Sequence, residues 1–246
     1  MAHLSTRLAS TAARLVLAIV LIACCQMANV TARAGDFEDG AAAAQKGDFA
    51  TALRLWTPLA EKGNSSAQYN LGLMYANGKG VAQDYKTAVK WYTLAAEQGI
   101  ADAQSNLGVM YVNGQGVAQD YKTAVKWYTL AAEQGYAKAQ FNLGVMYVNG
   151  QGVAQDYKTA VKWYTLAAEQ GIADAQSNLG VMYGKGQGVA QDYVKAHMWF
   201  NIAAIDGNAD AIKNRDIVAK LMTPAQLAQA QQLATRCMKS SYKDCD

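Results

Sequence analysis

A segment of 36 residues is repeated four times in this 246-residue chain. The stretch that begins at Ala67 returns at Ala103, Ala139 and Ala175, and a tryptophan recurs with the same period. A period of this length is typical of solenoids, in which each supersecondary unit packs only on its neighbours. The predicted units span residues 64–99, 100–135, 136–171 and 172–207.

Each unit contains two amphipathic helical segments joined by a turn. In the first unit, one helical face consists of Ala67, Leu71, Met74 and Tyr75. The second segment follows the same period, begins after the potential N-cap Asp84 and ends at Gly99, a typical C-cap residue. The aromatic rows of the second segments, Trp127 and its copies included, are predicted to lie in the core.

The repeats are flanked by segments that are expected to cap the stack. Residues 35–63 resemble a shortened, degenerate unit with Phe49, Leu53 and Trp56 at helical spacing. In the segment 208–246, Thr223 followed by a proline is a typical helix start. We expect capping helices here, the last of which closes the final apolar surface of the stack.

The repeated pattern A-x-A-Q-x-N-L-G-x-M-Y-x-x-G-x-G-V-x-Q-D-Y-x-x-A-x-x-W-Y-x-x-A-A-x-x-G resembles the Sel-1-like repeat family, a relative of tetratricopeptide repeats. The resemblance covers all four units. It implies an all-α, right-handed superhelical solenoid of helix hairpins that acts as an adaptor or regulator, in bacteria often exported. Family members with a cysteine pair in every repeat are linked to penicillin binding. The four units contain no cysteine, so that activity is not carried over.

The first 34 residues have the pattern of a secretory signal peptide. Two arginines precede the apolar run Leu15–Cys25, and Ala32-Arg33-Ala34 has the small-x-small form that signal peptidase accepts. The run is shorter than the roughly 20 residues that a transmembrane helix needs. We therefore expect a periplasmic or secreted protein without a transmembrane anchor in the mature form. Leu21–Cys24 also has the form of a lipobox, so a lipoprotein anchored at Cys24 stays an alternative.

Charge and cysteine content narrow the classes of partner. Removal of the predicted leader takes away three arginines and no acid, which lowers the formal net charge from +3 to zero. Nucleic-acid binding depends on surplus Lys and Arg and is therefore excluded. The two remaining cysteines, Cys237 and Cys245, are expected to form a disulfide, as an even pair in an exported protein commonly does.

Comparison of the four units with one another indicates a candidate binding surface. The first helices differ at positions spaced i, i+3, i+7 and i+10, which form a single face, and the resemblance places first helices on the concave side. Together with a row of asparagines, this face gives the predicted partner-binding residues Tyr69, Asn70, Asp102, Ser105, Asn106, Lys138, Phe141, Asn142, Asp174, Ser177 and Asn178. The alternative is neutral drift at exposed positions, with asparagines that satisfy helix backbone.

The sequence offers little to support catalysis. The glycines of Gly114-Gln115-Gly116 follow a helix and lack the other residues of a phosphate-binding loop, so they indicate an inter-helix turn. His197 is the only histidine after the leader, and no cofactor or metal is expected. We therefore expect a monomeric scaffold for a protein or peptide partner in the cell envelope. The alternative is an envelope hydrolase or a penicillin-binding or β-lactamase-like activity, by family association only.

Overall fold

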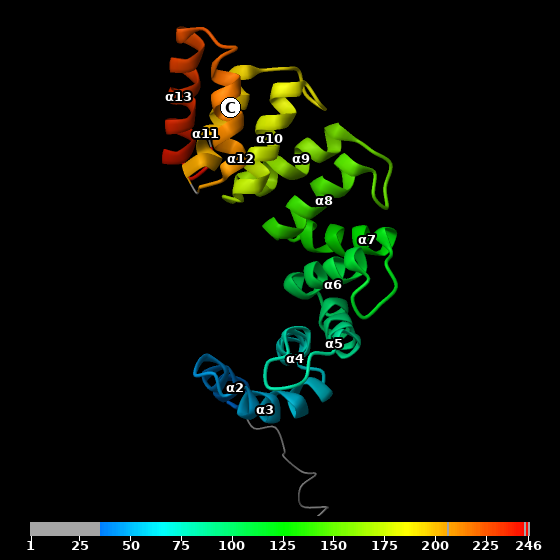
Figure 1. The fold of residues 1–246 in the computed structure, drawn as a ribbon. Coiled ribbons are helices and arrows are strands. Elements are labelled where there is room, and N and C mark those ends of the chain that lie inside the picture. The colour runs from blue at the N-terminus through cyan, green and yellow to red at the C-terminus, as the bar shows by residue number, and fades with distance from the viewer. Residues whose placement is uncertain (1–34, 206, 244, 246) are drawn as a thin grey trace, which may run out of the picture.

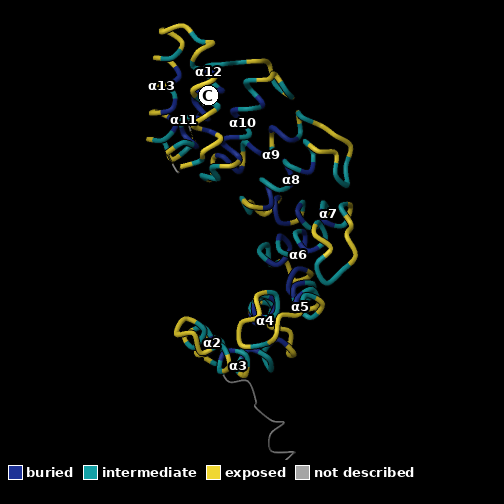
Figure 2. Tube along the Cα trace, in the orientation of Figure 1, coloured by how far each residue is buried: buried dark blue, intermediate teal, exposed yellow. Residues whose placement is uncertain are grey.

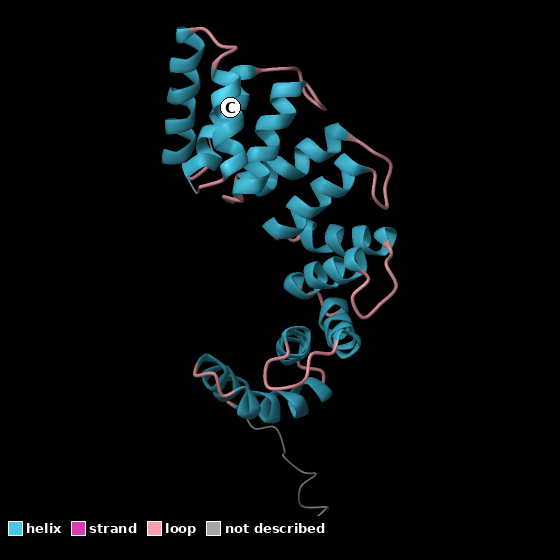
Figure 3. Ribbon diagram, viewed as in Figure 1, coloured by secondary structure: helices cyan, strands magenta, loops and turns pink. Residues whose placement is uncertain are grey.

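The computed structural model describes residues 35–246, apart from residues 206, 244 and 246. The predicted leader, with the lipobox cysteine Cys24, lies outside the described residues. The described part consists of helices and loops and contains no strand (Figure 3). The predicted all-α fold of helix hairpins is therefore confirmed. None of the helices in this part is both long and apolar enough to cross a membrane.

Four helix hairpins correspond to the four sequence repeats. Their helices are α4 (Ser65–Asn77) with α5 (Tyr85–Glu97), α6 (Ala101–Asn113) with α7 (Tyr121–Glu133), α8 (Ala137–Asn149) with α9 (Tyr157–Ala168), and α10 (Ala173–Lys185) with α11 (Tyr193–Ile205). They are preceded by α2 (Asp36–Gln45) and α3 (Phe49–Glu61) and followed by α12 (Ala209–Ala219) and α13 (Pro224–Lys239). The hairpins stack into an arc, with α4 and α6 on its inner side and α5 and α7 on its outer side (Figure 1).

Within each hairpin, an aromatic ring of the second helix lies on a glycine of the first. In the second unit a Cβ added to Gly108 would lie 2.5 Å from the ring of Tyr128, which is only 3% exposed. Only glycine allows this close approach of ring and helix backbone. The same contact occurs in the other units, between Gly72 and Tyr92, Gly144 and Tyr164, and Gly180 and Phe200. All four rings are buried. We call the buried residues that recur in every hairpin, dark blue in Figure 2, the buried strip.

The turn between the two helices requires glycine for a different reason. Gly114 ends α6 in the left-handed region at φ 67°, and Gly116 has φ 72°. Gly116 also lies against the backbone of Tyr85 in the preceding unit, where a side chain would not fit. Asp120 then caps α7 by accepting hydrogen bonds from the backbone N–H groups of Lys122 and Thr123. The predicted turn and cap are confirmed.

The tryptophans pack on the core clusters at the junctions between successive units. Trp127 is half-buried and packs on the core cluster at the junction of the first and second units, which contains residues of α5, such as Tyr92, and of α6, such as Leu107. The prediction that its ring is buried is wrong. Neighbouring positions of a helix point about 100° apart, so only one of Trp127 and Tyr128 can face the glycine of the first helix. Trp199 is the exception in its row, at 4% exposed.

Buried glutamines form a second link between units. The Gln104 side chain is 4% exposed and donates a hydrogen bond to the carbonyl of Ala96 at 3.0 Å. Its own oxygen accepts a hydrogen bond from Gln134 at 2.8 Å. Gln68 and Gln140 make the same pair of bonds. Buried amides are satisfied in this way at every junction between units except the last, where Gln176 Oε1 has no partner.

The last hairpin of the stack is incomplete. Helix α12 occupies the place of a first helix, but Asp216 stands where the four units have the ring-accepting glycine. Helix α13 packs on α11 and has few contacts with α12. Three large apolar side chains of this end are therefore largely exposed: Ile212, Ile217 and Leu221. The expectation that the terminal helix closes the final apolar surface is wrong in this respect.

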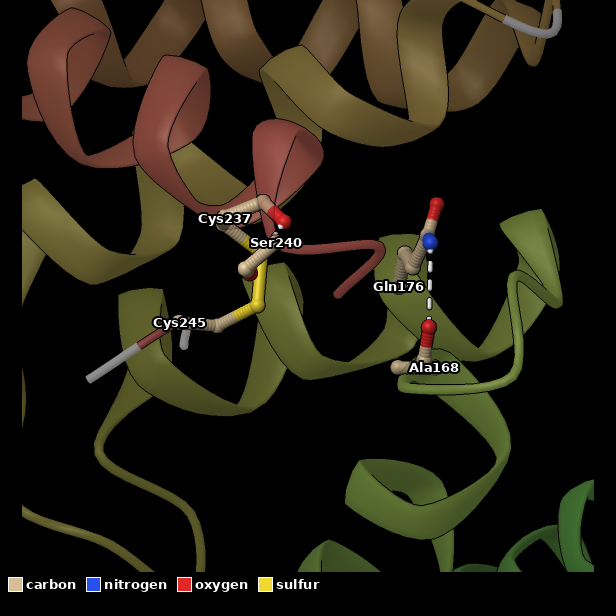
Figure 4. Close-up of a disulfide and its surroundings, with 5 residues drawn as sticks. All are labelled: Ala168, Gln176, Cys237, Ser240 and Cys245. Atoms are coloured by element: carbon tan, nitrogen blue, oxygen red, sulfur yellow. Dashed lines mark hydrogen bonds between the residues drawn. A yellow bond between two sulfur atoms is a disulfide. The ribbon is translucent and has the colours of Figure 1, made fainter. Parts of the chain in front are cut away.

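A disulfide fixes the chain after α13. Cys237 and Cys245 are joined, and both are buried, at 0% and 9% exposed (Figure 4). The Ser240 hydroxyl donates a hydrogen bond to the Cys237 carbonyl at 2.7 Å within the closed loop. The loop also brings the ring of Tyr242 near Gly171 of the third unit. The disulfide thus holds the end of the chain against the stack.

His197 is a buried polar residue at the same end of the stack. Its side chain is 4% exposed, and its Nδ1 atom has no hydrogen-bond partner. Burial lowers the pKa of the imidazole, the nearby Arg215 lowers it further, and Asp216 opposes the shift. The equivalent positions of the other units are Val89, Val125 and Val161. The neutral imidazole therefore replaces a packing valine.

We predict that Tyr128→Ala lowers the free energy of unfolding by about 3 to 5 kcal/mol, because it empties the ring site on Gly108. Trp127→Ala should cost clearly less, since that ring is only half-buried. Tyr128→Phe is the control, because Phe200 shows that the ring site needs no hydroxyl. Urea unfolding followed by circular dichroism measures all three. Equal losses for Tyr128→Ala and Trp127→Ala would contradict the packing described.

We predict that acid destabilises the fold partly through His197. Because its pKa is lower in the folded chain than in the unfolded chain, the folded state is stabilised above the ordinary value near 6.5. That stability is lost as the pH falls below 6.5, when the unfolded state binds the proton more readily. Urea unfolding at pH 7.5 and at pH 5 should show a smaller pH dependence for His197→Val than for the unchanged chain. An identical dependence in both proteins would contradict this role of the buried imidazole.

Candidate functional site

Three hollows lie at equivalent positions along the first helices. Their volumes are about 260, 400 and 300 Å³ in chain order. The first is lined by Leu73, Ala76, Tyr92, Asn106 and Val109; the second by Val145, Val148, Tyr164, Asn178 and Val181; and the third by Val181, Gly184, Phe200, Asn214 and Ile217. Equivalent residues lie two repeats apart in the first and second hollows and one repeat apart in the second and third. We call the face that carries residues 73, 109, 145, 181 and 217 the inner surface.

The hollows follow directly from the packing of ring on glycine. The ring of the second helix, such as Tyr164, forms the floor, and the first helices of two successive units form the walls. Apolar side chains at positions 145 and 148 of one unit face Asn178 and Val181 of the next across this floor. The same arrangement of ring and first helices forms each of the three hollows.

The inner surface carries little charge. Among the residues that line the three hollows, Lys185 is the only charged one, and it borders the second and the third. Burial raises the pKa of the Tyr164 hydroxyl to about 12, and a hydrogen bond with Asn178 partly opposes this shift. Burial also raises the pKa of Tyr92, against a hydrogen bond with Asn106. The floor therefore stays uncharged at neutral pH and suits apolar side chains of a ligand.

The predicted asparagines lie along this surface. All four, Asn70, Asn106, Asn142 and Asn178, are half-buried, and Asn106 and Asn178 line hollows. Hydrogen bonds of Asn106 with Tyr92 and of Asn178 with Tyr164 explain part of the repetition of the asparagines. Asn214 continues the row on α12.

One of the predicted variable positions, residue 69 with its copies 105, 141 and 177, is buried deeper than expected. Tyr69 and Phe141 are half-buried, with ring centroids 6.0 Å from Tyr92 and 5.9 Å from Tyr164. Ser105 and Ser177 take the same place in the other two units and are only 4% and 6% exposed. The expectation that this position is exposed is wrong, because the floor ring of the same unit packs beside Tyr69 and Phe141, and both serines are buried.

The variable residues at the helix starts connect units instead of lining hollows. Asp102 accepts a hydrogen bond from the Tyr136 hydroxyl at 2.7 Å, and Asp174 accepts one from Asn208 at 2.9 Å. Lys138 is exposed outside the hollows. The structure thus brings the asparagines together with apolar walls that sequence reasoning did not select. The sequence did contain a signal for these walls, because positions 145, 148 and 181 vary among the units and lie on the same helical face as the selected residues.

Two larger depressions lie elsewhere on the described part of the molecule and are weaker candidates for a binding site. One, of about 560 Å³, is lined by α13 alone, from Ala228 to Lys239, and is therefore an open helix surface. The other, of about 520 Å³, lies beside Trp91 and the Gln68–Gln98 hydrogen bond at the first junction. In the described part of the chain, no group of three or more His, Cys, Asp or Glu residues is placed to hold a metal ion.

Comparison with known proteins agrees with this architecture. The profile of the Sel1 repeat matches residues 65–100, 101–136, 137–172 and 173–208, which is more than half of the chain. The chain is similar to c5321, a protective antigen of uropathogenic Escherichia coli strains with an SLR fold, at 38% identity and a TM-score of 0.78. The match covers 84% of this chain and 46% of c5321, so this chain spans about half of that protein.

A second similar structure is a Sel1 repeat protein from Oxalobacter formigenes. It has 33% identity and a TM-score of 0.70, and the match covers 85% of this chain and 86% of that one. Comparison with curated proteins gives no match. Sel1 repeat proteins are protein-interaction scaffolds. The helix hairpin with its ring on glycine is thus the Sel1 repeat, and the chain belongs to the Sel1 repeat family.

Proposed function

We propose that this protein is an exported interaction scaffold that holds an extended segment of a partner protein along its inner surface. The observation that carries the proposal is the recurrence of one hollow, with a ring floor, apolar walls and an asparagine, at three equivalent places along the stack. A row of equivalent hollows suits a chain molecule better than a single compact ligand. Sel1 repeat proteins are generally non-catalytic, and we propose the same here.

The asparagines supply the polar half of the proposed recognition. An extended peptide has unpaired backbone N–H and C=O groups, and a carboxamide can both donate to and accept from them. Asn106, Asn142, Asn178 and Asn214 present such groups at one per unit. Backbone contacts of this kind give affinity, and apolar side chains of the partner that enter the hollows give selectivity.

The proposed compartment is the periplasm or the exterior. The leader pattern at residues 1–34 supports export, and the joined Cys237 and Cys245 support an oxidising environment. A lipid anchor at Cys24 is compatible with the same compartment. The partner is accordingly proposed to be a protein of the cell envelope.

We predict that the unchanged chain selects peptides with apolar side chains from a displayed peptide library. The double variant Val109→Asn and Val145→Asn should weaken binding of the selected peptides at least about tenfold, since it makes two hollow walls polar. Fluorescence anisotropy with labelled peptides measures the affinities, and circular dichroism checks that the variant is folded.

The control is Leu166→Glu on the outer helix α9, where the leucine is 42% exposed and lines none of the hollows. This variant should bind the peptides as the unchanged chain does. If the outer variant weakens binding and the double inner variant does not, the binding surface has been assigned to the wrong side.

A further inference from the structure

The third hollow differs from the other two in three ways. Gly184 replaces the alanine or valine found at positions 76, 112 and 148, and Lys185 replaces the asparagine found at 77, 113 and 149. Its far wall comes from α12, which contributes Ile217 and Leu221. The inner surface therefore ends in a site that is not a copy of the others.

Gly184 has no evident structural function. A Cβ at this position would meet only Ala196 Cβ, at an ordinary contact distance of 3.7 Å. By contrast, a Cβ at Gly180, one helical turn earlier, would lie 2.6 Å from the ring of Phe200. Glycine within a helix is less favourable than alanine or valine unless packing demands it. What the glycine does at this position is leave space in the wall of the hollow.

The far wall of the hollow is unusually apolar and open. Ile217 and Leu221 are 48% and 59% exposed, because α13 packs on α11 and leaves this face of α12 uncovered. They lie one helical turn apart and border the same hollow as Phe200 and Val181. A branched or aromatic side chain of a ligand would bury apolar area against all four.

Lys185 adds a single positive charge at the edge of this hollow. It is exposed, and no acidic residue in the described part of the chain forms an ion pair with it. No carboxylate lines the hollow to neutralise it. A ligand group that lies beside Lys185 is therefore best matched by a negative charge next to the apolar side chain.

We propose that the third hollow is an anchor site for a bulky apolar side chain of the partner segment that is directly flanked by a carboxylate. The side chain occupies the space left by Gly184, against Phe200, Ile217 and Leu221, and the carboxylate pairs with Lys185. This inference rests on the proposed function and gives it a direction, since the anchor fixes one end of the bound segment at α12. The carboxylate belongs to an acidic side chain or to the end of the partner chain.

The test uses short, fluorescein-labelled, serine-rich peptides that differ in one pair of residues and carry an amidated end. The pairs are Leu-Asp, Leu-Asn, Leu-Lys and Ser-Asp, and a fifth peptide ends in leucine with a free carboxylate. We expect Leu-Asp to bind about tenfold more tightly than Ser-Asp, from burial of the leucine. Leu-Asn should bind up to about fivefold more weakly than Leu-Asp, because an exposed ion pair contributes little.

Two variants introduce the equivalent residues of the third unit and test whether the peptides bind in the third hollow. Gly184→Val should remove the preference for leucine, and Lys185→Asn should make the Leu-Asp and Leu-Asn peptides bind equally. Ala76→Val, a change of the same kind in the first hollow, is the matched control and should leave both preferences intact. Thermal unfolding should show that Gly184→Val remains folded, because its Cβ is accommodated.

The outcomes separate the anchor from the scaffold function. Tighter binding of the free-carboxylate peptide than of the Leu-Asp peptide assigns the charge to the end of the partner chain, and the reverse assigns it to a side chain. If all the peptides bind with the same affinity whatever their residue pair, or if Gly184→Val and Lys185→Asn leave the affinities unchanged, the anchor is overturned. The scaffold proposal is not affected by either result. Failure of all peptides here and in the displayed library overturns both. Self-association of the chain that Gly184→Val abolishes would assign the hollow to a second copy and overturn the anchor.

Discussion

The packing of an aromatic ring on a helix glycine is the contact on which the rest of this structure depends. In each unit the missing Cβ of the glycine lets the ring reach the backbone of the first helix, and the small alanines around it complete the buried strip. The ring then becomes the floor of a hollow between two units. The contact that holds a hairpin together therefore also shapes the surface that we propose binds a partner.

Repetition of this contact needs links that pass from one unit to the next. Trp127 packs on the core cluster that α5 and α6 share at the junction of two units, and Gln104 joins a backbone carbonyl to Gln134. Where the links stop, the stack ends. Asp216 replaces the ring-accepting glycine, and α13 turns back onto α11. The exposed apolar face of α12 and the third hollow are both consequences of that interruption.

The sequence predicted the fold well because the repeat length and the helix faces are local patterns. The caps at Asp120 and Thr223 were predicted for the same reason. Which of the neighbouring Trp127 and Tyr128 enters the core was not predictable from periodicity, since it depends on how the outer helices rotate against the next unit. The predicted surface lies on the same helices as the hollows, but Ser105 is buried and Asp102 bonds to the next unit. Such contacts between units cannot be predicted from the residue pattern of a single helix face.

The central claim is tested most directly by comparing the unfolding free energies of Gly108→Ala and Gly184→Ala. Alanine should stabilise a helix by up to about 1 kcal/mol relative to glycine wherever it fits. At position 184 it fits, so the free energy of unfolding should rise or stay unchanged. At position 108 the added methyl group displaces the ring of Tyr128, and a loss of about 1 to 3 kcal/mol is expected. A gain in stability at both positions would contradict the account.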